Sequence, residues 1–322
     1  MDTKPADSKR LASPIFLVGA ERSGTTLLRL MFNHHPKITW VNEFEYAVDM
    51  MDDPSAWPAV EDYAAWLDQH RVFRATGLEL DRSLSYADAV NDFLVQWKRR
   101  ADRPIIGATV HRHFDRIPRI WPDARFIHLV RDARDVSRSR VELGWWEGDY
   151  YHAALIWLET EKLWDRFRDT LPPQRWTQLR YEDLVAEPVE HLRRVCALIG
   201  ADYDPAMLEY HRDTTYGPVD PKLSYQWKRK LSGHDIRLVE AAAGEMMKRR
   251  GYEMSGRPEL KVTPRLLFKQ DMINRWRRWR FRVKRYGLRL WLADWFSRRV
   301  GGASWQRKVR LAMNTVDESY LK

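Results

Sequence analysis

Short apolar runs alternate with longer amphipathic stretches along the first 200 residues. The apolar runs predict β-strands, and the stretches with apolar residues three and four positions apart predict helices. The predicted strands are Pro14–Val18, Ile38–Val41, Ile105–Ala108, Phe126–Val130 and Trp176–Arg180. The predicted helices are Thr25–His34, Ala59–His70, Leu84–Arg100, a stretch around Asp115–Trp121, Val136–Leu143, Tyr151–Thr170 and Glu190–Ile199. This alternation predicts an α/β fold, a parallel β-sheet flanked by helices.

A different pattern follows Tyr252, where Gly256, Pro258 and Pro264 interrupt the alternation. Beyond them, apolar residues recur every three or four positions, at Met272, Trp276, Trp279, Val283, Tyr286 and Leu290. Such spacing predicts a helix with one Trp-rich stripe. We therefore expect an N-terminal extension at 1–13, an α/β domain at 14–255 and a basic helical extension at 256–322.

Charge separates the extension from the body. The chain of 322 residues has a net charge of +10 and 44% hydrophobic residues, which is enough for a folded core. Residues 257–322 hold 18 basic and 5 acidic residues, whereas the rest holds 37 and 40. The body is thus net acidic, which argues against a nucleic-acid groove across it.

Composition also limits the compartment. The single cysteine, Cys196, excludes an intramolecular disulfide and a Cys-based zinc site. Met1–Ser13 lacks the apolar run of a secretory signal, and no run of 18 apolar residues occurs. We expect a cytoplasmic protein.

The segment Pro14–Leu28 joins a strand, a loop bounded by Gly19 and Gly24, and a helix. This is the arrangement of a Walker A loop, in which backbone N–H groups and the positive end of the helix surround a phosphate. Thr25 stands where Walker A has the lysine that serves nucleoside triphosphates, so the loop predicts another anion. Arg22 places a positive charge inside the loop. A purely structural glycine turn is the alternative.

The segment Glu21–Thr26 resembles the loop that holds the 5′-phosphosulfate in sulfotransferases that use 3′-phosphoadenosine 5′-phosphosulfate (PAPS). It differs at Glu21, where that family has proline. The resemblance implies transfer of a sulfuryl group from PAPS to a hydroxyl or amine, with release of 3′,5′-ADP and without a metal. It also accounts for Thr25, because PAPS has no γ-phosphate.

A second family signature is a strand followed by Arg and, eight residues later, Ser, which together hold the 3′-phosphate. Arg131 and Ser139 have this spacing after the strand Phe126–Val130. The alternative is a solvated salt-bridge cluster of Arg131, Asp132, Arg134 and Asp135.

Weaker similarities extend the resemblance to about Pro14–Tyr252. They are Trp121–Phe126, Arg180–Leu184, the basic segment Ser224–Ser232 and Gly251–Tyr252. Trp227 has a core position as its alternative. The resemblance assigns the co-substrate to Arg22, Ser23, Gly24, Thr25, Thr26, Leu27, Arg131, Ser139, Tyr181, Trp227, Lys228 and Arg229.

Two residues are candidates for the base that accepts the acceptor's proton, with Arg22 as the cation beside the bridging oxygen. Glu43 lies 21 residues after Arg22, the spacing of the base in tyrosylprotein and many bacterial members. His111 matches the histidine of cytosolic phenol and steroid members, but Thr109 replaces their lysine. The second cation is then unassigned among His111, Arg112 and the Trp227–Lys230 segment. A metal at His111 and His113 is not expected.

Neighbouring side chains give less specific predictions. We expect Glu45 to be a solvated neighbour of Glu43 or a substrate contact. The segment 44–103 is rich in aromatic residues and lines an acceptor pocket or forms ordinary core.

The extension leaves its partner open. A Trp-rich stripe beside many arginines at 265–300 is typical of a helix on an anionic membrane, here the inner face. Packing on the body and pairing in a homodimer are equal alternatives. For the whole chain, the alternatives to a sulfotransferase are a P-loop kinase or nucleotidase, which Thr25 opposes, and a non-catalytic membrane adaptor.

Overall fold

The computed structural model describes residues 10–144 and 147–319, which form two compact units. The first unit consists of the chain up to Leu67, Thr76–Asp132 and Glu159–Gln226. The second consists of Asp68–Ala75, Ala133–Leu158 and the chain from Trp227 onward. The predicted sheet lies entirely within the first unit.

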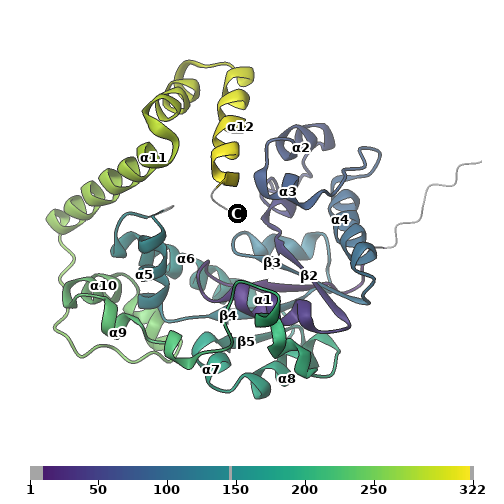
Figure 1. Cartoon of the computed structure of the whole chain (residues 1–322), viewed down its shortest axis with the longest axis horizontal. Coiled ribbons are helices and arrows are strands. Elements are labelled where there is room, and N and C mark those ends of the chain that lie inside the picture. The colour runs from purple at the N-terminus through teal and green to yellow at the C-terminus, as the bar shows by residue number, and fades with distance from the viewer. Residues whose placement is uncertain (1–9, 145–146, 320–322) are drawn as a thin grey trace, which may run out of the picture. The chain divides into compact units, whose positions relative to one another are not determined.

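The sheet has five parallel strands in the order β2-β3-β1-β4-β5 (Figure 1). The strands are β1 (Ile15–Val18), β2 (Ile38–Glu43), β3 (Ile105–Val110), β4 (Arg125–Val130) and β5 (Trp176–Arg180). β1 is central: its Ile15 pairs with Gly107 of β3 and with Arg125 of β4. All four residues of β1 are buried, as expected for an apolar strand covered on both faces. The predicted α/β fold is confirmed.

Helices and short 3-10 turns connect and cover the strands. The α-helices of this unit are α1 (Thr25–His34), α2 (Val60–Leu67), α4 (Tyr86–Ala101), the second half of α6 (Tyr150–Arg168), α7 (Tyr181–Ala186) and α8 (Pro188–Ile199). The 3-10 turns are η1 (Glu45–Ala47), η2 (Phe114–Arg119), η3 (Pro173–Arg175), η4 (Pro205–Arg212) and η5 (Pro221–Leu223). The stretch predicted around Asp115–Trp121 is therefore a 3-10 turn, with Pro118 inside it.

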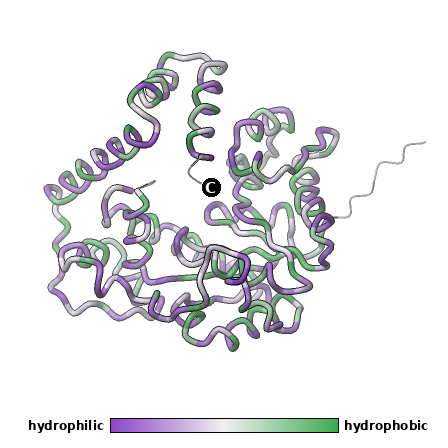
Figure 2. Tube along the Cα trace, in the orientation of Figure 1, coloured by the Kyte–Doolittle hydropathy of each residue, from purple (hydrophilic) through white to green (hydrophobic). Residues whose placement is uncertain are grey.

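Two cores fill the faces of the sheet. One contains Leu28 and Phe32 of α1, Leu192 and Val195 of α8, and Tyr210 of η4. The other is aromatic, with the ring of Phe126 4.8 Å from that of Phe167. Figure 2 shows hydrophobic and hydrophilic residues alternating along the helices, the pattern from which they were predicted.

The second unit is helical in its described part. It holds α3 (Arg71–Thr76) apart from its last residue, α5 (Ala133–Leu143), the first half of α6, α9 (Trp227–Lys230), α10 (Gly233–Arg249), α11 (Pro264–Val300) and α12 (Ala303–Ser319). α11 is broken at Gly287, whose φ of 75° and ψ of 156° are not helical.

α11 buries polar side chains and exposes aromatic ones. Gln270 and Asn274 are buried, whereas Trp276 and Trp279 are 53% and 45% exposed. The burial of Asn274 is explained by its side-chain amide, because its Oδ1 accepts a hydrogen bond of 2.7 Å from the backbone N of Gly148. Arg277 donates to the carbonyl oxygen of Gly148 at 2.9 Å. The predicted helix is correct, but its Trp stripe is not the face that packs within this unit.

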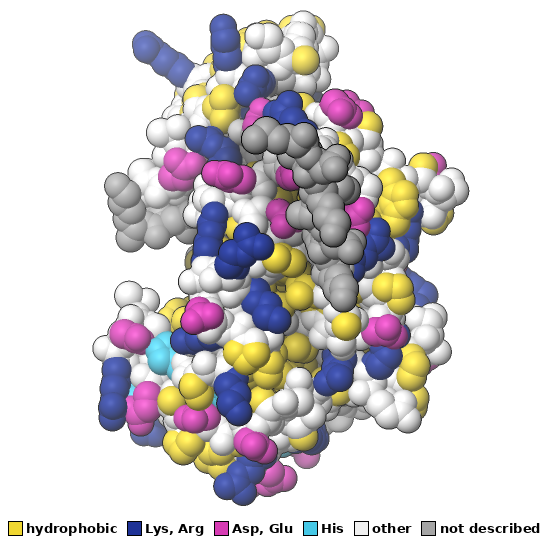
Figure 3. All heavy atoms as spheres, turned by 90° about the vertical axis from the view of Figure 1, so that its right-hand side faces the viewer, with side chains coloured by type: hydrophobic (Ala, Val, Ile, Leu, Met, Phe, Trp, Pro, Cys, Tyr) yellow, Lys and Arg dark blue, Asp and Glu magenta, His cyan; other side chains and the backbone are white. Residues whose placement is uncertain are grey.

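The face of the molecule drawn in Figure 3 carries charges of both signs. Figure 3 shows Lys and Arg side chains interspersed with Asp, Glu and apolar side chains over one face of the molecule. Among the described residues, no helix is long and apolar enough to cross a membrane.

Candidate active site

The carboxyl ends of the five strands meet at one edge of the sheet, the usual ligand edge of an open parallel sheet (Figure 1). Each strand delivers a predicted site residue or segment there. β1 leads into the loop Gly19–Gly24, β2 ends at Glu43, β3 is followed by His111, β4 by Arg131, and β5 by Tyr181. The parallel topology thus gathers residues that lie up to 162 positions apart in the sequence.

The loop between β1 and α1 has a backbone suited to an anion. Gly19, Arg22 and Gly24 all have positive φ, at 145°, 73° and 96°. Gly24 directly precedes α1, so the free N–H groups of the first helical turn face out of the helix start. The hydroxyl of Ser23 is buried without a hydrogen-bond partner among the described residues. An unpaired buried hydroxyl in such a loop fits a bound phosphosulfate group.

A cavity of about 590 Å³ opens beside this loop. That is a usual size for a small-molecule site. Its lining includes seven predicted co-substrate residues: Arg22, Gly24, Thr25, Thr26, Leu27, Arg131 and Tyr181. The rest of the lining comes from Tyr210 and from the segment Tyr216–Leu223 apart from Pro221.

Arg131 and Tyr181 are held against each other at this cavity. The guanidinium carbon of Arg131 lies 4.2 Å from the centre of the Tyr181 ring. Its Nη2 donates to the carbonyl oxygen of Leu223 at 2.9 Å. The backbone N of Asp132 donates to Oε1 of Glu182 at 3.0 Å, which joins the ends of β4 and β5. Asp132 and Glu182 are buried, so the alternative of a solvated cluster is wrong for this part of the segment.

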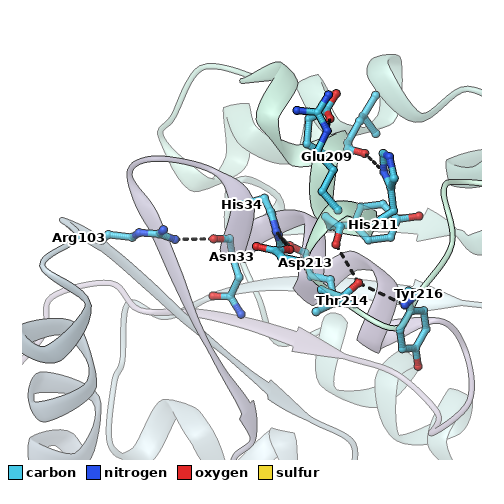
Figure 4. A network of polar contacts seen from close by, with 12 residues as sticks. Asn33, His34, Arg103, Glu209, His211, Asp213, Thr214 and Tyr216 are labelled. Atoms are coloured by element: carbon cyan, nitrogen blue, oxygen red, sulfur yellow. Dashed lines mark hydrogen bonds and ion pairs between the residues drawn. The ribbon is translucent and has the colours of Figure 1, made fainter.

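The segment after η4 is fixed to the end of α1, as Figure 4 shows. Nε2 of His34 and Oδ1 of Asp213 are 2.7 Å apart. Oγ1 of Thr214 donates to the carbonyl oxygen of Tyr210 at 2.8 Å and accepts from the backbone N of Tyr216 at 3.3 Å. These bonds hold Tyr216 at the cavity.

The two candidate bases lie at the ends of neighbouring strands. Glu43 is exposed and pairs in register with Thr109 of β3. Nδ1 of His111 lies 2.9 Å from the carbonyl oxygen of Gly19, which requires a proton on Nδ1 and leaves Nε2 as the second nitrogen. Neither residue lines the 590 Å³ cavity.

The expectation that Glu45 is a solvated neighbour of Glu43 is wrong, whereas a contact with the substrate stays a prediction. Glu45 is 5% exposed, and its Oε1 accepts a hydrogen bond of 2.9 Å from the backbone N of His111. Burial raises the pKa of Glu45, while the neighbouring charge of His111 lowers it and that of Glu43 raises it.

Arg112, one candidate for the second cation, and Thr109, which replaces the family's lysine, both have other partners. Arg112 forms two hydrogen bonds with the carboxylate of Asp49, at 2.8 and 2.7 Å. The hydroxyl of Thr109 accepts a bond of 3.1 Å from Nε1 of Trp40. The described residues contain no group of three His, Cys, Asp or Glu side chains arranged for a metal.

The remaining predicted co-substrate residues belong to the second unit. Ser139 is partly buried on α5, and Lys228 and Arg229 are exposed on α9. Trp227 is buried, with the guanidinium carbon of Arg134 3.6 Å from its ring centre. Its backbone N donates to Oδ1 of Asp135 at 2.9 Å. Arg134 and Asp135 are buried, so they do not belong to a solvated cluster either.

Sequence reasoning missed Tyr210 and Tyr216, which line the cavity, and Arg29 on α1. No motif marks the two tyrosines, because they reach the site through the packing of η4 on α1. Arg29 carried a weak signal, a charge in a largely apolar helix next to the loop.

Comparison with known proteins agrees with this geometry. The model of the sulfotransferase family matches residues 14–205. Protein-tyrosine sulfotransferase A of Caenorhabditis elegans is 23% identical over 279 residues, covering 78% of this chain and 70% of its own. The omega-hydroxy-beta-dihydromenaquinone-9 sulfotransferase Stf3 of Mycobacterium tuberculosis is 25% identical over 300 residues, covering 74% and 75%.

Solved structures share the fold. The sulfotransferase domain from the curacin biosynthetic pathway has a TM-score of 0.55 at 20% identity, covering 76% of this chain and all of that domain. The sulfotransferase domain of the Synechococcus PCC 7002 olefin synthase has a TM-score of 0.51 at 22% identity, covering 78% and 99%. The family match spans more than half of the chain and contains the phosphate loop, Arg131 and Tyr181. The chain belongs to the sulfotransferase family, and it is a PAPS-dependent sulfotransferase.

Proposed function

We propose that this enzyme transfers the sulfuryl group of PAPS to a hydroxyl of a lipid-like acceptor, with an amine as the less favoured acceptor group. The observation that carries the proposal is the cavity beside the loop Gly19–Gly24, lined by Arg131 and Tyr181. PAPS supplies the sulfuryl group and leaves as 3′,5′-ADP. The relatives named above are a protein-tyrosine sulfotransferase and an omega-hydroxy-beta-dihydromenaquinone-9 sulfotransferase. Tyrosine and an omega-hydroxy compound both carry a hydroxyl, which favours a hydroxyl acceptor.

The residues of the loop are proposed to hold the phosphosulfate end of PAPS. The backbone N–H groups of Gly24–Leu27 and the Ser23 hydroxyl donate hydrogen bonds to the phosphosulfate. Arg22 stabilises the negative charge that develops on the bridging oxygen. Arg131 and Ser139 take the 3′-phosphate. Tyr181, Trp227, Lys228 and Arg229 complete the nucleotide side of the site.

Glu43 is proposed as the general base. Its carboxylate is exposed at the carboxyl edge of the sheet, where an acceptor can approach it, and it takes the proton of the acceptor hydroxyl. His111 is the second candidate, because its Nε2 is not the nitrogen that bonds to Gly19.

The extension 256–322 is proposed to bring the enzyme to the inner face of an anionic membrane, with the catalytic domain at 14–255 and an otherwise cytoplasmic location. Trp276, Trp279 and Trp295 are 53%, 45% and 39% exposed on α11, beside an excess of basic residues. Exposed tryptophans with flanking arginines suit the interface of an anionic bilayer. Homodimer formation through the same face is the alternative.

The catalytic proposal is tested with labelled PAPS and two acceptor sets, extracted lipids and small polar hydroxyl compounds. We expect PAPS-dependent label in the lipid fraction with wild-type protein. Glu43→Gln should lose at least about 100-fold in turnover and keep its affinity for 3′,5′-ADP. Full activity of Glu43→Gln together with an inactive His111→Ala would assign the base to His111.

The membrane proposal is tested by sedimentation with vesicles of phosphatidylglycerol and phosphatidylcholine. The full chain should bind at low salt and be released as salt rises. Replacing Trp276 and Trp279 by Ser should weaken binding without changing 3′,5′-ADP affinity. If the variant binds vesicles as the wild type does but changes from dimer to monomer, the aromatic face is a dimer interface.

A further inference from the structure

Arg29 lies in the middle of α1, the helix that follows the phosphate loop. It comes four residues after Thr25 in α1, so the two side chains share one face of the helix. Side chains in helices lean toward the N-terminus. This tendency favours a guanidinium of Arg29 that extends toward the loop proposed to bind the co-substrate.

The Nε atom of Arg29 is buried, and no described residue offers it a hydrogen-bond acceptor. Buried polar atoms are nearly always paired, because desolvation without a partner is unfavourable. Arginine also keeps its positive charge in proteins. A buried, charged nitrogen without a protein acceptor indicates a group that is completed by a bound anion.

The surroundings of Arg29 identify which anion this is. Burial lowers the pKa of Arg29, and the nearby Tyr216 phenol and Glu43 carboxylate raise it. Tyr216 lines the cavity that Arg22 also lines, and Glu43 is the proposed base. Arg29 does not itself line the cavity, but Thr25, one helical turn before it on the same face, does, so Arg29 lies beside the co-substrate cavity. The charge of Glu43, the proposed base, acts on it as well. The transferring group must lie between the cavity and Glu43.

We propose that Arg29 contacts the sulfuryl group of PAPS and supplies the second positive charge of the transfer site. This inference rests on the proposed function. Arg29 would supply the charge that the family's lysine provides and that Thr109 lacks. Arg112 cannot supply this charge while it is bound to Asp49. During transfer the sulfur–oxygen bond to the 5′-phosphate breaks, the bond to the acceptor oxygen forms, and Glu43 takes the proton. Arg29 keeps its protons and stabilises the negative charge on the sulfuryl oxygens.

The test compares the binding of PAPS with that of 3′,5′-ADP by titration calorimetry, without an acceptor. The two ligands differ in the sulfuryl group that Arg29 is proposed to contact. In Arg29→Gln, the affinity for PAPS should fall about tenfold or more, the range of a lost charge-assisted hydrogen bond, while the affinity for 3′,5′-ADP stays within about twofold. Arg29→Lys should recover part of the PAPS affinity, because it keeps the charge but not the fork.

Arg99→Gln is the matched control, since it removes an exposed arginine of α4 with the same change in net charge. Equal loss of both ligands in Arg29→Gln, or loss of neither, would overturn the inference. Wild-type protein that binds neither ligand would instead overturn the proposed function. In turnover assays with labelled PAPS, Arg29→Gln should lower kcat and leave the KM for the acceptor unchanged. A raised KM with unchanged kcat would make Arg29 an acceptor contact.

Discussion

The aromatic ring of Tyr181 packs directly on the α-carbon of Gly24. A Cβ atom added at Gly24 would overlap Cδ2 and Cε2 of that ring. The contact joins the end of β5 to the phosphate loop, and Arg131 stacks on the same tyrosine ring. One tyrosine thus contacts both the loop proposed to hold the 5′ end of PAPS and the arginine proposed for its 3′-phosphate.

Gly24→Ala should therefore abolish co-substrate binding. The φ of 96° at Gly24 is unfavourable for an L-residue, and the new methyl group must displace Tyr181. We expect 3′,5′-ADP affinity to fall at least about 100-fold in fluorescence titration. Gly302→Ala is the control, because nothing lies within 4 Å of a Cβ atom there. Normal binding by Gly24→Ala would show that the loop does not form the site.

Arg131 and Arg22 should have separable effects. Arg131 is 9% exposed, and we assign it to the distant 3′-phosphate, so Arg131→Ala should weaken PAPS and 3′,5′-ADP alike by about 2–4 kcal/mol. Arg22→Ala should instead lower kcat by at least about 100-fold and largely spare 3′,5′-ADP. Titration and single-turnover assays on both variants check this. Unchanged nucleotide affinity in Arg131→Ala contradicts its assignment.

Glu45 should make the stability of the protein depend on pH. Its pKa is raised in the folded state by burial, so folding favours the protonated form. The contribution of protonated Glu45 to the free energy of unfolding is therefore present at low pH, and it is lost as pH rises through the pKa of Glu45 in the folded state. Glu45→Gln cannot ionise and should gain in Tm over the wild type as pH rises from 5 to 8, by about 2 °C or more. A Tm difference that stays constant across this range would contradict the sign.

Cys196 should report on unfolding. Its thiol is buried, lies 3.7 Å from Sδ of Met207, and has a pKa raised by burial to about 11. Because the thiolate is the reactive form, a disulfide reagent at pH 8 should react at least about 100-fold faster in denaturant than in buffer. Rapid labelling of the native protein would mean that the core of α8 and η4 opens readily.

The sheet was the most predictable part of the molecule. The strands β1 and β5 and the helix α1 follow from local apolar patterns, and their ends agree with the prediction within one residue. α10 was missed, although Ser232 caps it by accepting from the backbone N of Asp235. Its run Ala241–Ala243 and Gly244 weaken the apolar periodicity, so the cap was the better signal.

The site was predictable only where motifs carry it. Glu45 follows a strand end and looked solvated, but its burial depends on His111, which lies 66 residues later. The packing of α11 was not predictable either, because Asn274 satisfies the backbone of Gly148 far away in the sequence. Partners of this kind are set by tertiary structure, not by local pattern.

The break at Gly287 lies within a segment of α11 and α12 whose two ends are bound to each other. Just before the break, Arg285 and Tyr286 bind the carboxylate of Asp317 on α12, at 2.6 and 3.0 Å. Arg282 reaches across the break to Asp294 at 3.0 Å. The segment between residues 285 and 317, which contains the end of α11 and most of α12, is therefore closed at its two ends by ion pairs and hydrogen bonds. Such a segment should unfold as a whole when the contacts to Asp317 break. Its backbone amides should therefore exchange with solvent as one cooperative group, and not progressively from the C-terminus.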